Sequence, residues 1–174
     1  MTLGAGGAGG GSACSPTTDK LGSTDISGSP PSRPKDVAVC HLHTPTCYGS
    51  LATAYVRHAD ANESSAKVCV YSDDGDSVAN SGDLKIGCSA DITSSAIEWD
   101  SAAMDGGSLT AGNYWVCMAV KSDATNTFSI DLGSTTRPFA YKTASGFYAT
   151  PPANLNGLTT TSGAEQSIYI TVGP

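Results

Sequence analysis

The fold class follows from one apolar segment, Leu109-Thr110-Ala111-Gly112-Asn113-Tyr114-Trp115-Val116-Cys117-Met118-Ala119-Val120. Gly112 permits a tight turn ahead of the strand, because glycine has no Cβ atom. Successive side chains of a strand point to opposite faces, so Tyr114 and Trp115 are expected on different faces. The run 114–120 is apolar throughout, which predicts a central strand covered by protein on both faces.

Shorter β-rich segments occur along the chain at the regular spacing typical of a sandwich. They are 37–40, 52–57, 67–71, 84–88, 97–99, 127–132, 139–142 and 166–172. We expect 67–71 and 84–88 to pair as a hairpin through an acidic turn. Since no segment has a helical period, the chain is predicted to be all-β, with a single jelly-roll-like antiparallel β-sandwich.

The first 36 residues differ from the rest in composition. Residues 1–12 are rich in glycine, and 29–34 contain three prolines. Such a segment has too few large apolar side chains to offset the entropy lost on ordering. We therefore expect an extended Gly/Ser/Pro-rich N-terminal arm (1–36), followed by the sandwich (37–174). Residues 1–34 are expected to have almost no helix or strand, to be ordered only by other chains and to serve in assembly.

The charge of the chain argues against two classes of partner. The chain has nine basic and 16 acidic residues, which gives a net charge of -7 and a pI of about 4.6. Nucleic acids and anionic membranes require clustered lysine and arginine, so neither is expected. No apolar run is long enough to cross a bilayer, and residues 1–4 do not resemble a signal peptide. An extracellular location is expected.

The six cysteines predict disulfides, because an even count in a turn-rich chain is typical of proteins that mature in an oxidising environment. Cys40 and Cys47 are expected to pair with each other. At least one bridge is expected among three other cysteines, which are Cys69, Cys88 and Cys117. Cys14 lies alone on the arm and is the candidate for an interchain bond.

Two clusters contain residue types that bind metals. His41 and His43 lie beside cysteines, but the spacing matches no zinc site, and a Cys40–Cys47 disulfide with exposed histidines is favoured. Asp73, Asp74 and Asp76 offer oxygen ligands, but they do not match the spacing of a calcium loop, and acidic turn chemistry is favoured. No metal and no cofactor are expected.

The chain shows no nucleophile elbow and no H-E-x-x-H motif, so we do not expect an enzyme. Exposed aromatic side chains can instead stack on sugar rings. The candidates for glycan contact are Trp99, Tyr141, Phe147 and Tyr148. The alternative is that most of these side chains belong to the core.

Residues 67–155 resemble jelly-roll modules of tailed-phage tail-fibre and decoration proteins, and are also similar to extracellular carbohydrate-binding modules. The motifs are VCVYSD at 68–73, KIGCS at 85–89 and the L-x-A-G-x-Y-W step at 109–115. The resemblance implies a structural virion-surface subunit, with virion proteins, copies of itself and a host-surface glycan as partners. The alternative is a carbohydrate-binding module. The uncharged segment 168–172 makes a poor free edge, which favours a homo-oligomer.

Overall fold

The computed structural model describes residues 12–15, 19–26, 32–33, 37–58, 64–94, 96–121, 128–129, 132–143 and 146–174. These residues form fourteen strands and no helix. The strands are β1 (Lys20–Gly22), β2 (Ser32–Arg33), β3 (Val37–His43), β4 (Gly49–Arg57), β5 (Ser64–Ser72), β6 (Lys85–Cys88), β7 (Ile92–Ser94), β8 (Trp99–Ala103), β9 (Ser108–Leu109), β10 (Tyr114–Val120), β11 (Phe128–Ser129), β12 (Leu132–Thr143), β13 (Thr159–Gln166) and β14 (Ile168–Gly173).

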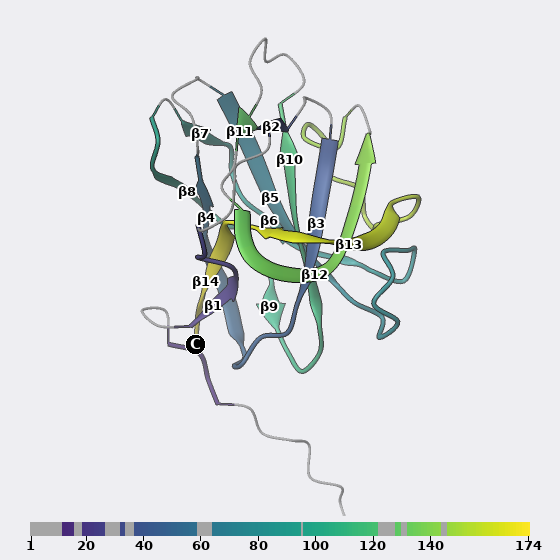
Figure 1. The fold of residues 1–174 in the computed structure, drawn as a ribbon. Coiled ribbons are helices and arrows are strands. Elements are labelled where there is room, and N and C mark those ends of the chain that lie inside the picture. Colours follow the sequence, from purple (N-terminus) through teal and green to yellow (C-terminus); the bar gives the residue numbers. More distant parts are fainter. Residues whose placement is uncertain are drawn as a thin grey trace, which may run out of the picture.

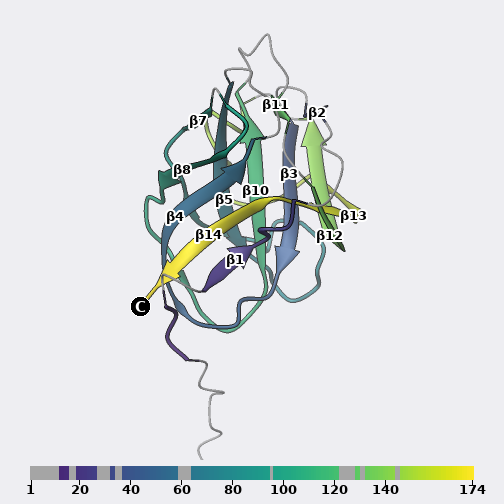
Figure 2. The same cartoon turned by 60° about the vertical axis from the view of Figure 1, so that its left-hand side comes forward.

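Two antiparallel sheets pack together as a sandwich (Figures 1 and 2). The first sheet has the order β1-β14-β4-β8, with β9 also paired to β4. The second has the order β13-β12-β3-β10-β5-β6, with β7 also paired to β5, and β2 and β11 form a separate pair. The predicted all-β sandwich and the antiparallel pairing of β5 with β6 are confirmed.

Strand β10 is central, as its sequence predicts. It lies between β3 and β5, and all seven of its side chains are buried. Tyr114 faces the core between the two sheets, which it shares with Ile170 of β14. Trp115 faces a second apolar cluster on the other side of the same sheet, where Phe147 and Leu155 cover it. The second sheet therefore has a core on each face, and this explains the uninterrupted apolar run.

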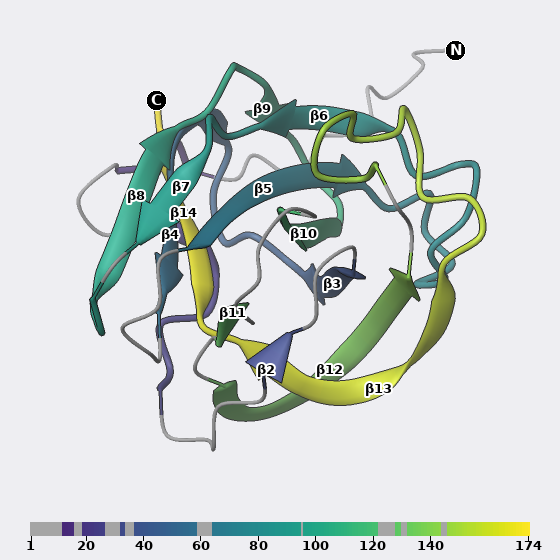
Figure 3. The same ribbon diagram turned by 90° about the horizontal axis from the view of Figure 1, so that it is seen from above.

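Strand β14 shows that the apolar segment 168–172, from which a homo-oligomer was expected, is covered within its own chain. It lies between β1 and β4, and Ile168, Ile170 and Val172 are buried in the core between the sheets. Seen from above, it continues β13 and carries the chain from one sheet to the other (Figure 3). β13 is not among the predicted strands, because its Thr/Ser/Gly-rich sequence has no apolar alternation.

Four cysteines lie in one row across the second sheet. Cys117 is in register with Cys40 on one side and with Cys69 on the other, and Cys69 is in register with Cys88. The disulfides are Cys40–Cys117 and Cys69–Cys88. The expected bridge among Cys69, Cys88 and Cys117 is confirmed. The expected Cys40–Cys47 bridge is wrong, because β10 pairs with β3 and places Cys117 directly beside Cys40.

The N-terminal segment corrects a second expectation. Cys14 forms an intrachain disulfide with Cys47, so in this structure it is not available for an interchain bond. Strand β1 extends the first sheet, and Leu21 is 1% exposed within the core. The prediction that residues 1–34 are ordered only by other chains is wrong for 12–15 and 19–26, which are held by their own chain. The expected scarcity of strand agrees with these two segments, because β1 has only three residues. Residues 1–11 lie outside the described residues.

A buried polar cluster stabilises the corner at which β13 ends and β14 begins. Ser23 donates a hydrogen bond to Glu165 over 2.8 Å, and Arg137 forms an ion pair with the same carboxylate. Ser167 donates to the carbonyl oxygen of Asp25. Since Glu165 is buried, its charge is compensated by these donors. The segment before β2 is thereby tied to the corner.

Candidate ligand-binding pocket

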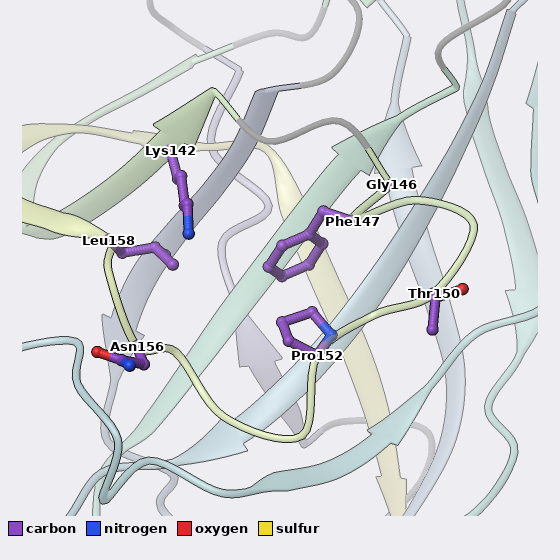
Figure 4. Close-up of a pocket in the computed structure, with 7 residues that line it drawn as sticks. All are labelled: Lys142, Gly146, Phe147, Thr150, Pro152, Asn156 and Leu158. Atoms are coloured by element: carbon purple, nitrogen blue, oxygen red, sulfur yellow. The ribbon is translucent and has the colours of Figure 1, made fainter.

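A pocket of about 330 Å³ lies on the outer face of the second sheet, beside the loop that connects β12 to β13 (Figure 4). This volume is at the lower end of the range for small-molecule sites. The lining residues are Lys142, Gly146, Phe147, Thr150, Pro152, Asn156 and Leu158. Figure 4 shows the Lys142 side chain extending from β12 toward a space bordered by Leu158 and by the rings of Phe147 and Pro152.

The loop is fixed to the sheet by several hydrogen bonds. The hydroxyl of buried Tyr71 donates to the carbonyl oxygen of Pro152 over 3.1 Å, and the backbone N–H of Lys85 donates to Ala153 over 2.9 Å. The Lys85 ammonium also donates to the carbonyl oxygen of Pro151 over 3.2 Å. Burial raises the pKa of Tyr71 well above its ordinary value, so it remains a donor at neutral pH. The pocket wall is therefore preformed.

Phe147 combines two roles in this wall. Its side chain is buried in the second core, and its ring lies 6.4 Å from the ring of Tyr71 in a tilted arrangement. It also borders the pocket together with Pro152 and Leu158. Phe147 is only 6% exposed, so a small part of its ring borders the pocket, and that part is held at little entropic cost because its rotamer is already restricted by packing. Of the four predicted glycan contacts, Phe147 is the one that lines the pocket.

Trp99 belongs to a different cluster, on the outer face of the first sheet. Tyr169 of β14 stacks on Tyr55 at 4.6 Å between ring centroids, and Trp99 meets Tyr169 edge-on at 5.0 Å. The Lys20 ammonium lies 4.3 Å from the centroid of Tyr169. The ring of Tyr169 already contacts Tyr55, Trp99 and Lys20. These side chains therefore mainly stabilise one another across neighbouring strands.

The two remaining aromatic candidates lie apart from the pocket lining. Tyr141 is 43% exposed on β12 and packs against Phe139 at 5.6 Å. Tyr148 is half-buried, and the ammonium of Lys67 lies 5.1 Å from its ring centroid. Lys67 in turn pairs with Asp91 over 3.4 Å. The structure thus places the four predicted glycan contacts in separate surroundings.

The histidine candidates for metal binding are buried in the interior, contrary to the expected exposure. His41 lies 5.0 Å from the ring of Phe139. Burial and the neighbouring Arg137 lower the pKa of His43 from 6.5 to about 4, although the negative charge of Glu165 acts in the opposite direction. Both neighbouring cysteines are in disulfides with other cysteines, so no thiolate is available for a zinc ion here.

The acidic candidates take part in turn chemistry. Backbone N–H groups donate to the side chains of all three: Ser77 to Asp73, Asp76 to Asp74 and Val78 to Asp76. Three carboxylates of this group lie close together at the surface. Their oxygens accept hydrogen bonds that order the loop, which is the role that acidic turn residues commonly have.

Sequence reasoning did not single out Lys142, Pro152 or Leu158. Residues 139–142 were expected to form a strand, but this local pattern does not show that the strand lies beside the loop at 146–158. The available signal was the Pro151-Pro152 pair, which marks an ordered rather than a flexible connection.

Comparison with known proteins returns no relative: no protein-family model matches the chain, and no curated protein does. Three disulfides indicate an oxidising, extracellular-type environment. None of the described segments is a helix long and apolar enough to span a membrane.

Proposed function

We propose that this protein is a non-catalytic β-sandwich, displayed on a virion or another extracellular surface, that recognises a carbohydrate. The observation that carries the proposal is the preformed pocket in which Phe147 and Pro152 face the Lys142 side chain. Pockets that combine apolar rings with one or two polar groups are the common form of small-molecule sites.

A sugar ring suits the shape and chemistry of this pocket. One face of a pyranose carries several C–H groups, which pack favourably against the electron-rich face of an aromatic ring. Phe147 and Pro152 supply such apolar surfaces, and Asn156 and Thr150 supply polar groups at the rim. A single residue at the end of a glycan fits a cavity of about 330 Å³ better than an extended chain does.

The proposed setting is the surface of a virion, as a fibre, decoration or tail- or capsid-associated subunit. It rests on the resemblance of residues 67–155 to phage jelly-roll modules, and three disulfides in one small sandwich suit an extracellular location. A carbohydrate-binding module of an extracellular protein is the second candidate, and the pocket supports both. Neighbouring virion proteins and copies of this chain are the proposed assembly partners.

Replacing Phe147 by leucine tests the carbohydrate role. Leucine keeps most of the buried volume but removes the aromatic face, so we expect glycan affinity to fall about tenfold while the fold is retained. Binding is measured for the full oxidised chain on a glycan array and by ligand-observed NMR. Trp99→Leu, which removes an aromatic ring from the first sheet, is the matched control and should bind normally.

Two results would contradict the carbohydrate proposal. One is an oxidised, folded wild-type chain that binds no saccharide on the array or in solution. The other is a loss of binding in Trp99→Leu together with full binding in Phe147→Leu, which would move the site to the first sheet. Thermal unfolding of each variant separates a lost contact from a lost fold.

A further inference from the structure

We propose that the pocket selects a sugar residue that carries an anionic group, a carboxylate or a sulfate, with Lys142 as the counter-ion. This inference rests on the proposed carbohydrate function and adds the charge class of the ligand. It is carried by three observations, which are the unpaired ammonium of Lys142, the glycine at position 157 beside that ammonium and the apolar walls of the pocket.

The first feature is the pairing state of Lys142. Other lysines of the described chain have partners: Lys67 pairs with Asp91, Lys85 donates to Pro151 and Lys20 lies over Tyr169. Within that same described part, the side-chain ammonium of Lys142 has no hydrogen bond, ion pair or cation–π contact. The chain has 16 acidic residues against nine basic ones. An unpaired, half-buried ammonium in such a chain is suited to an external anion.

The second feature is a glycine that leaves room beside this ammonium. A Cβ atom on Gly157 would lie 3.1 Å from the Lys142 Nζ atom, which is tighter than ordinary van der Waals contact. Gly157 also has a φ of +80°, a backbone conformation that favours glycine over other residues. The loop therefore passes close to the ammonium, and a side chain at position 157 would press on Lys142 and displace it from its place at the pocket wall.

The third feature is the apolar surroundings of the charge. Phe147, Pro152 and Leu158 line the same space as Lys142. A charge-assisted hydrogen bond is stronger than a neutral one, and screening by water is weaker beside apolar walls. A sugar whose ring packs on Phe147 and whose anionic substituent reaches Lys142 uses both parts of the pocket. A neutral sugar leaves the ammonium without a charged partner.

The test compares matched saccharides on the full oxidised chain. The probes are galacturonic acid, N-acetylneuraminic acid, galactose 6-sulfate and neutral galactose, each as a methyl glycoside, with acetate as a charge-only probe. Binding is followed by NMR titration at fixed ionic strength. We expect at least one anionic sugar to bind about tenfold more tightly than galactose, which corresponds to about 1.4 kcal/mol. The carboxylate and sulfate probes identify which group is accepted.

Two variants assign the preference to Lys142. Lys142→Gln should reduce the affinity for the anionic sugar to that for galactose, and Lys142→Arg should retain a preference because it keeps the charge. Lys20→Gln, which removes one charge from the opposite sheet, is the control and should leave the preference unchanged. Lys142 lies at the surface of β12, so its replacement is expected to leave thermal unfolding unaltered.

Each remaining outcome overturns a defined part of the argument. The wild-type chain could bind galactose and the anionic sugars equally well, and Phe147→Leu could lose this binding. That result contradicts the preference for an anion but supports the carbohydrate function. A preference that survives Lys142→Gln contradicts the role of this lysine. Acetate binding as tight as that of the best sugar shows a site for charge alone. Failure of every sugar to bind removes both proposals.

Discussion

At the scale of single residues, His43 links stability to pH. Its pKa is lowered from 6.5 to about 4, mainly by burial. The folded state therefore binds fewer protons than the unfolded state between these values, and stability falls as the pH drops through this range. This shift in pKa corresponds to a loss of about 3 kcal/mol in the free energy of unfolding between pH 7 and pH 4. Urea unfolding at pH 7.0 and pH 4.0 measures this loss.

The control for this prediction is His43→Gln, which has no titratable group. The readout is the difference in the free energy of unfolding between the two pH values, so a change in the absolute stability of the variant does not affect the comparison. Asp83, whose pKa is raised by burial, titrates in both proteins and cancels in the comparison. An unchanged pH dependence in His43→Gln would assign the loss to other groups.

At the scale of elements, β13 is an open edge of the second sheet. Among the described strands it pairs only with β12, and its eight residues contain neither proline nor lysine. Exposed edges of this kind pair with other chains unless charge or proline blocks them. We expect the full chain to self-associate at micromolar concentration, and Thr161→Lys to shift it toward the monomer. Sedimentation velocity measures both.

The matched control for the edge is Ser81→Lys, which adds the same charge to an exposed turn. It should sediment like the wild-type chain. A wild-type protein that remains monomeric at these concentrations would contradict the role of β13 as an assembly surface. The pocket would then be the proposed binding site of a monomeric sandwich.

At the scale of the whole molecule, the Cys14–Cys47 disulfide and β1 hold the N-terminal segment on the sandwich. The bridge closes a separation of 33 residues, which is worth about 3 to 4 kcal/mol in the chain-entropy model. We expect the double replacement Cys14→Ser and Cys47→Ser to lower the free energy of unfolding by this order. We also expect faster tryptic cleavage after Lys20, measured by mass spectrometry.

The comparison for this prediction is Cys69→Ser with Cys88→Ser. That pair lies within the second core, so its loss should also destabilise the protein but leave the Lys20 site protected by β1. Non-reducing electrophoresis of the wild-type chain should show no covalent oligomer, because the Cys14 sulfur is already bonded within the chain. A disulfide-linked dimer would contradict the intrachain pairing.

The amino-acid sequence was sufficient to predict the class of the fold and a central strand that is buried on both faces. β-Branched and aromatic segments, short spacing and the absence of a helical period are local properties, and they predicted an all-β sandwich. The apolar run at 114–120 was sufficient to predict a strand buried on both faces, and the even cysteine count was sufficient to predict disulfides.

Only the tertiary structure decided which cysteines pair and which residues form the pocket. Cys40 meets Cys117 because β10 lies beside β3 in one particular register, and register depends on contacts between segments far apart in the chain. Lys142 meets Phe147 and Pro152 because hydrogen bonds from Tyr71 and Lys85 fold the loop back over the sheet. Local patterns do not contain such long-range contacts, and both the disulfide row and the binding site depend on them.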